Sequence, residues 1–173
     1  EISCSLVGSE MCIRDRALIK SGLLPYGDIT KLSEESPTLF RNNINRHVSH
    51  MATTKITSNK SPWLSSFTPG QGHSIAMSHG EGKFVVSDEV AKQLFENGQV
   101  ATQYVDLDGN PTMNGTYNIN GSSYAIEGIT SLDGRIFGKM GHSERYEDGL
   151  LKNIDGDKYQ NIFQNGVNYF RNK

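Results

Sequence analysis

The chain has 173 residues, a formal net charge of −2, and 35% hydrophobic and 21% charged residues. This is the composition of a globular domain and not of a disordered or fibrous chain. There is no basic excess that would predict nucleic-acid binding, and no apolar run approaches the ~20 residues of a membrane span. We therefore expect neither nucleic acid nor a membrane among its partners.

Both cysteines, Cys4 and Cys12, lie close to the N-terminus. A disulfide framework would distribute its cysteines along the chain. The first 16 residues also lack the continuous apolar core of a secretory signal. We expect a cytoplasmic, reducing location.

The N-terminal segment differs from the rest of the chain. Residues 1–16 show neither helical nor strand periodicity. The stretch from Leu6 to Asp15 matches the translation of a transposon-end sequencing adapter over ten residues; a genuine tail with this sequence is the alternative. We therefore expect a non-native leader at residues 1–16 and a partial native domain at residues 17–173.

In the first half of this domain, residues 17–25 read as the last turns of a helix, with Gly22 just past its end. A turn-rich linker follows at residues 33–37. Apolar and β-branched residues then predict three strands, at residues 47–57, 73–77 and 83–86.

The second half contains the clearest helix, between Ser87 and Gly98, with Ser87 as its N-cap. Strands follow at residues 100–105, 124–130 and 135–140, and Asp133-Gly134 predicts a hairpin between the last two. Residues 159–170 are partly helical, and the expected apolar face consists of Ile162, Phe163, Val167 and Phe170. This alternation predicts an α/β domain with a mixed sheet, part of which is missing.

Two segments carry residues suited to chemistry. His142 and Glu144 follow a predicted strand end, where an imidazole can accept a proton and a carboxylate can orient the ring. A solvated loop with a surface histidine is the alternative. His79 lies in the glycine-flanked stretch Ser78–Gly82, which is either a loop lining a site or a structural turn.

Other chemistries have weaker support. The glycine-containing loops at residues 70–72 and 80–82 do not fit the phosphate-loop or dinucleotide patterns. The histidines lack metal-ligand spacing, so no metal is expected. Cys12 precedes the first predicted helix, as a catalytic thiol can, but it lies inside the expected leader.

Several motifs occur in a fixed order along the chain: Ser61–Leu64, Ser78–Gly82, Asn97–Asp106, Ala125–Thr130 and Gly138–Arg145. Together they resemble the C-terminal glutamine amidotransferase domain of phosphoribosylformylglycinamidine synthase, in its long fused bacterial form. The resemblance runs from Ala17 to about Phe170. It implies a class I glutamine amidotransferase on a flavodoxin-like α/β sheet, with the N-terminal part of the sheet missing.

The resemblance also implies a reaction and its partners. A Cys-His-Glu triad would hydrolyse glutamine through a cysteinyl thioester, with His142 and Glu144 as the last two members. Ammonia would pass to the synthetase domain of the same chain, which uses ATP and Mg²⁺; no cofactor is expected in the amidotransferase domain itself. Arg46 lies in a segment that runs beside the glutamine pocket in the family, with a surface ion pair as the alternative, and His79 is a further candidate for substrate binding.

The nucleophile departs from the family pattern. The family elbow reads Gly-x-Cys-Asn-Gly-Phe-Gln, and Cys12 falls at the nucleophile position. Glu10 and Arg14 replace its glycines, and Arg16 replaces its glutamine. We therefore expect the chain as written to be inactive. The alternatives are a catalytically dead docking or regulatory module and a stand-alone glutaminase subunit of the same pathway.

Overall fold

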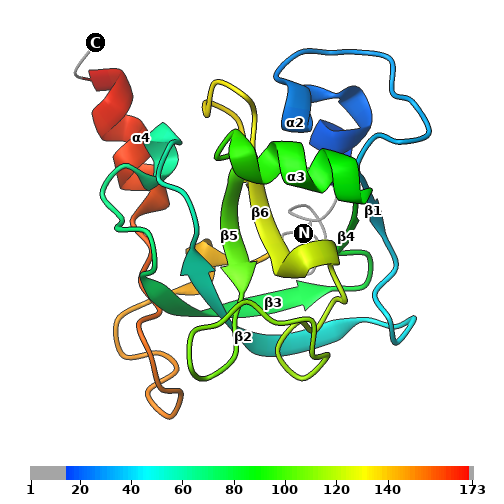
Figure 1. Ribbon diagram of the computed structural model, residues 1–173. Helices are drawn as coiled ribbons and strands as arrows, with labels where there is room; N and C mark the ends of the chain where they lie inside the picture. The colour runs from blue at the N-terminus through cyan, green and yellow to red at the C-terminus, as the bar shows by residue number, and fades with distance from the viewer. Residues whose placement is uncertain (1–14, 172–173) are drawn as a thin grey trace, which may run out of the picture.

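A computed structural model describes residues 15–171 of the chain. Its centre is a five-stranded antiparallel sheet in the order β3-β2-β5-β6-β7. β2 pairs with β3 from Val48–His79 to Lys55–Gly72, but with β5 only at residues 54–56. The sheet therefore bends sharply at this junction, and Figure 1 shows β2 and β3 running across the ends of β5 and β6. The strands are β2 (Val48–Ile56), β3 (Gly72–His79), β5 (Val100–Tyr104), β6 (Ile126–Thr130) and β7 (Phe137–Lys139).

A small second sheet lies beside the first. β1 (Thr38–Phe40) pairs antiparallel with β4 (Lys83–Val85). The strand β1 was not predicted, because three residues are too few for a period-2 pattern to stand out. Every strand pairing among residues 15–171 is antiparallel, so the expected mixed sheet is wrong for this part of the chain.

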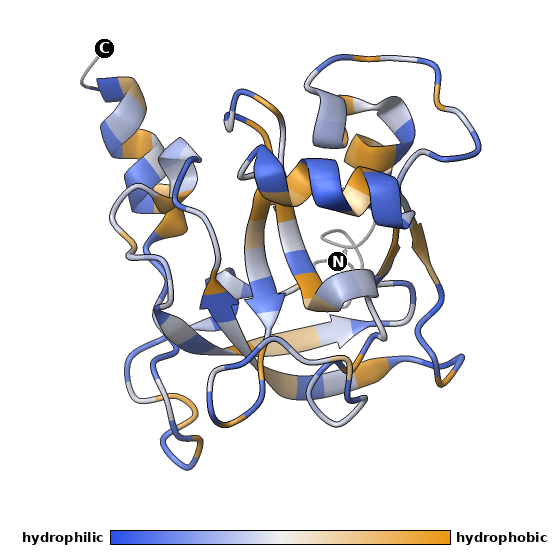
Figure 2. Cartoon of the chain, viewed as in Figure 1, coloured by the Kyte–Doolittle hydropathy of each residue, from blue (hydrophilic) through white to orange (hydrophobic). Residues whose placement is uncertain are grey.

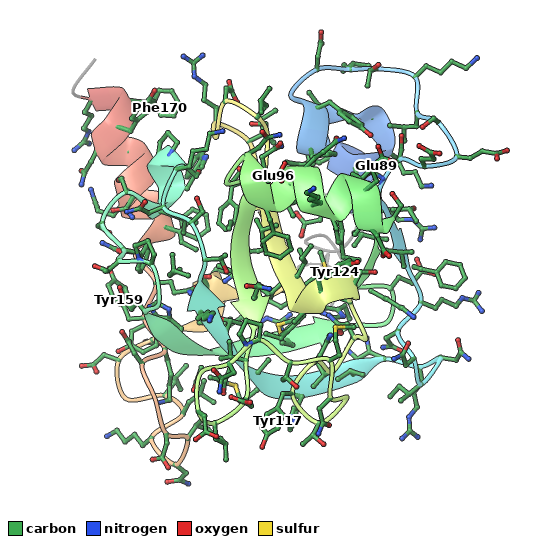
Figure 3. The ribbon with its side chains drawn as sticks, in the orientation of Figure 1. Glu89, Glu96, Tyr117, Tyr124, Tyr159 and Phe170 are labelled. Atoms are coloured by element: carbon green, nitrogen blue, oxygen red, sulfur yellow. The ribbon has the colours of Figure 1, made fainter. Side chains whose placement is uncertain are left out.

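The predicted central helix is confirmed as α3 (Asp88–Glu96). The Ser87 hydroxyl accepts a hydrogen bond from the Val90 amide and caps the helix. Ala91 and Leu94 are buried, and Leu94 belongs to a core cluster to which β5 and β6 contribute. Figure 1 shows α3 crossing the ends of β5 and β6. Figure 2 shows that the strand residues next to the helix are hydrophobic. Tyr124 lies below this helix and donates a hydrogen bond to Asp88 at 2.6 Å (Figure 3).

The hairpin predicted at Asp133-Gly134 is also confirmed. β6 and β7 pair antiparallel around it, and Gly134 adopts a φ of +75°. The preceding segment differs from the prediction, because residues 123–125 form a 3-10 turn, η2 (Ser123–Ala125), in place of the start of a strand. Tyr124 and Ala125 have φ values of +56° and +57°, which a strand cannot accommodate.

Helices lie at both ends of the described chain. Residues 15–21 are helical, and Gly22 ends the helix with a φ of +86°, as predicted. One further turn, α2 (Leu23–Tyr26), follows it. The C-terminal helix α4 (Ile162–Arg171) packs on the 3-10 turn η1 (Pro62–Leu64).

The face that α4 buries differs from the one predicted. Ile162 is buried as expected, but its neighbours in the interface are Asn165 and Gly166. Phe163 and Phe170 are 58% and 60% exposed, and Val167 is exposed as well. The reason is the contact with Trp63, because only a residue without a side chain lets the helix backbone approach the indole so closely.

Candidate active site

His142 lies where the two edges of the bent sheet meet. β3 and β7 are the outer strands, and Met77 of β3 forms an isolated antiparallel bridge with Gly141, just beyond β7. The His142 amide also donates to the Ala76 carbonyl at 2.8 Å. The predicted loop after β7 is therefore fixed from two sides and is not a free surface loop.

The predicted pair, His142 and Glu144, is in direct contact. Nδ1 of His142 lies 2.6 Å from Oε1 of Glu144. The His142 ring is fully buried, whereas the side chain of Glu144, in the middle of the turn η3 (Ser143–Arg145), is 28% exposed. Partial burial acts to raise the pKa of Glu144, but the hydrogen bond with His142 and the nearby Arg145 outweigh it and lower the pKa.

The contact determines which nitrogen of His142 is available. Because Glu144 is ionised at neutral pH, it accepts a hydrogen bond from Nδ1, and the proton of a neutral ring is assigned to that nitrogen. Nε2 then carries the lone pair, and it has no hydrogen-bond partner among residues 15–171. This is the arrangement of a general base with an orienting carboxylate.

A second charged pair, which could not be singled out from the sequence, lies behind this loop. Glu127 on β6 and Lys139 on β7 are both buried, and Nζ of Lys139 lies 3.9 Å from Oε1 of Glu127. Burial lowers the pKa of Lys139, while the nearby carboxylates, Glu127 first, raise it. The available signal was the presence of Glu127 and Lys139 inside the two segments predicted as strands, at residues 124–130 and 135–140.

His79 is a buried residue of the fold. Its Nε2 lies 3.2 Å from the Asn120 side-chain amide, and its ring covers Gly82 so closely that a Cβ there would be 2.4 Å from Cε1. Burial, followed by the charges of His142 and His47, lowers the pKa of His79 to about 4. These contacts match the structural-turn interpretation; a role in substrate binding stays a prediction.

The remaining candidates lie elsewhere. Arg46 is exposed, and its carbonyl accepts a hydrogen bond from Asn42 at 2.6 Å. Cys12 lies outside the described residues. Asp15, three positions further along, lines a cavity of about 220 Å³ together with Lys139, Ser143 and Glu144, so the first described helix starts beside the candidate site.

Residues 15–171 contain no group of three or more His, Cys, Asp and Glu side chains placed to hold a metal ion. None of their helices has both the length and the apolar character needed to cross a bilayer.

The bent α/β fold places the buried imidazole of His142 against the partly exposed carboxylate of Glu144, and the chemistry of such a pair suits the activation of a nucleophile. Comparison with known families is more specific: the CobB/CobQ-like glutamine amidotransferase domain matches residues 12–170. The chain belongs to this family.

Curated relatives and a solved structure agree with this assignment. The chain is 30% identical over 154 residues to phosphoribosylformylglycinamidine synthase subunit PurQ of Chlorobaculum parvum, covering 88% of the chain and 56% of the relative. The PurQ subunit of Synechocystis is 31% identical over 146 residues, covering 84% and 59%. The structure of PurLQS from Thermotoga maritima superimposes with a TM-score of 0.62 and 25% identity, covering 90% of this chain and 58% of that one. The chain thus spans little more than half the length of these relatives.

Proposed function

We propose that this chain is the glutamine-hydrolysing part of a phosphoribosylformylglycinamidine synthase, which supplies ammonia for purine biosynthesis. The observation that carries the proposal is the 2.6 Å contact between His142 and Glu144, together with the buried Nε2 on the other side of the ring. The choice of this synthase follows from the relatives, which are named as its PurQ subunits.

The pair would serve a cysteine thiol. The thiol transfers its proton to Nε2 of His142 as the sulfur attacks the amide carbon of the glutamine side chain. The imidazolium then protonates the leaving nitrogen, so that ammonia departs and a cysteinyl thioester remains. Water, deprotonated by Nε2, hydrolyses the thioester to glutamate and restores the thiol. Glu144 stabilises the imidazolium formed in both halves of the cycle.

In the sequence pattern of the family, Cys12 falls at the position of the nucleophile, three residues before Asp15. Its surroundings differ from the family elbow, because Glu10 and Arg14 replace small residues that a tight strand-to-helix turn needs. Arg16, at the position of the family's glutamine, forms an ion pair with Glu81. We therefore propose that the chain as written hydrolyses glutamine no faster than background.

The proposal includes a partner and a location. Ammonia would pass to a synthetase domain of the same enzyme, in which ATP and Mg²⁺ are used, and the enzyme would be cytoplasmic. Glutamine would be the ligand of the domain itself, with the exposed Arg46 as a candidate for its carboxylate. We assign no cofactor to this chain.

The test compares glutaminase rates of three chains. They are the chain as written, a variant in which residues 10–16 carry the family elbow, and that variant with His142→Ala. We expect glutamate release above background only from the elbow variant. A folded elbow variant whose rate does not change with His142→Ala would contradict the proposed role of His142.

Sequencing the source gene across the codon of Ala17, from a library made without transposon adapters, tests whether the elbow is native.

A further inference from the structure

Two charged side chains are enclosed behind the His142 loop without belonging to the His–Glu pair. The side chains of Glu127 and Lys139 are 0% and 6% exposed. Removing two charges from water costs several kcal/mol per ion, and apolar residues of similar volume often stabilise a core at least as well. Stability alone is therefore a weak explanation for this pair.

Glu127 holds the backbone on one side of His142. Its Oε1 accepts a hydrogen bond from the Gly141 amide at 2.5 Å. A Cβ at Gly141 would lie 2.9 Å from the same oxygen and 2.7 Å from Ile75 Cγ2, so the backbone fits closely between the two. The second carboxylate oxygen accepts from the Thr102 hydroxyl, which fixes the orientation of the carboxylate.

Lys139 holds the other side. Its ammonium group donates to the Ser143 hydroxyl at 3.1 Å and to Oε1 of Gln160 at 2.6 Å. Ser143 also donates to the same Gln160 oxygen at 2.6 Å. Ser143 lies between His142 and Glu144 in the chain, so these contacts fix the turn that brings the two side chains together.

We propose that Glu127 and Lys139 are positioning residues for the His142–Glu144 pair, which they hold through Gly141 and Ser143. The inference rests on the proposed glutaminase function, because it assigns these residues a role in that reaction. The hydrogen bonds themselves lie within this chain and do not depend on its activity. Neither residue reaches the reacting atoms; each acts through the backbone or hydroxyl that it binds.

The test is the NMR signal of the His142 Nδ1 proton in ¹⁵N-labelled chain, whose low-field shift and exchange with water report the contact with Glu144. The variants are Glu127→Gln and Lys139→Met, each of which leaves one buried charge without its partner, and the double variant, which removes both charges. We expect each single variant to increase the exchange rate of this proton by at least about tenfold, because an unpaired buried charge weakens the hydrogen bonds that hold the loop. In the double variant the exchange rate should return part of the way to that of the unchanged chain.

Two further variants keep the outcome decisive. Leu94→Ala creates a cavity in the core beneath α3 without touching these hydrogen bonds, and it should leave the His142 signal unchanged. Ser143→Ala removes one contact of Lys139 at a partly exposed position, and it tests the lysine if the charge variants do not fold. An unchanged signal in folded Glu127→Gln and Lys139→Met, or in Ser143→Ala where those do not fold, would overturn the proposal. So would an equal loss in Leu94→Ala.

This measurement requires no glutamine turnover. If the elbow variant proves inactive while the Nδ1 signal depends on Glu127 and Lys139, the proposed function fails and the positioning role stands. If the elbow variant is active and the signal does not depend on these residues, only the positioning role fails.

Discussion

Gly141 pairs with Met77 across the seam where the two outer strands of the bent sheet meet. The residues are 64 positions apart in the chain, and the bridge closes the sheet immediately before His142. The hydrogen bond from the His142 amide to Ala76 continues this pairing by one residue. The position of the imidazole therefore depends on the curvature of the whole sheet.

The first prediction concerns Glu144 in the variant that carries the family elbow. Glu144→Gln keeps the size of the side chain but cannot stabilise an imidazolium. We expect kcat for glutamine hydrolysis to fall by roughly 10²–10⁴ with little change in KM, since the interaction is strongest in the transition state. Glu147→Gln, an exposed change three residues away, is the matched control. Equal kcat values for the two variants would argue against a role for the carboxylate.

The second prediction is a pH dependence of stability caused by His79. Its pKa is about 4 in the fold and 6.5 when unfolded, so the unfolded chain binds the extra proton between these pH values. The free energy of unfolding should therefore decrease as the pH falls from about 6.5 to 4, by up to about 3 kcal/mol from this residue.

Urea denaturation at a series of pH values measures this effect. His79→Gln, which keeps a polar group near Asn120, should flatten the curve in that window. The exposed His50 provides the control, because His50→Gln should leave the slope as it is. Burial also lowers the pKa of His73, so this residue adds to the loss of stability below about pH 6.5, and it stays in both variants. A slope unaffected by His79→Gln would contradict the burial argument.

Features with local causes could be predicted from the sequence. The cap at Ser87 and the turn at Gly134 each depend on residues a few positions apart, and both were predicted correctly. The adjacency of His142 and Glu144 was also visible. Which ring nitrogen faces the carboxylate was not, because the backbone of that turn is set by Glu127 and Lys139 from two paired strands.

Features with distant causes could not be predicted. The helical pattern of α4 suggested that Phe163 and Phe170 would be buried, but the interface follows from the contact of Gly166 with Trp63, about a hundred residues earlier. The short strand β1 (Thr38–Phe40) is recognised by its pairing with β4, more than forty residues later in the chain. Hydrophobic periodicity describes one segment at a time and contains no information on such pairings.

The third prediction tests the interface of α4. Gly166→Ala would favour an isolated helix by about 1 kcal/mol, but its Cβ would lie 2.2 Å from Cζ3 of Trp63. We expect the clash to dominate and the free energy of unfolding to decrease by about 1–3 kcal/mol, with a change in Trp63 fluorescence. Gly115→Ala, where nothing lies within 4 Å of the added carbon, should change neither. A stabilised Gly166→Ala chain with unchanged fluorescence would contradict the packing.

The fourth prediction separates backbone strain from steric exclusion in the hairpin that leads to the site. Gly134 and Gly109 have φ values of +75° and +79°, so alanine costs about 1 kcal/mol of backbone energy at either position. Only at Gly134 would the new Cβ meet other atoms, at 3.2 Å from the Lys60 carbonyl oxygen and from Ser61 Cα. The Gly134 carbonyl also accepts a hydrogen bond from the Ser61 hydroxyl at 2.7 Å, which a shift of the turn would weaken. Chemical denaturation should therefore show a larger loss for Gly134→Ala than for Gly109→Ala, and equal losses would mean that backbone strain alone accounts for the cost.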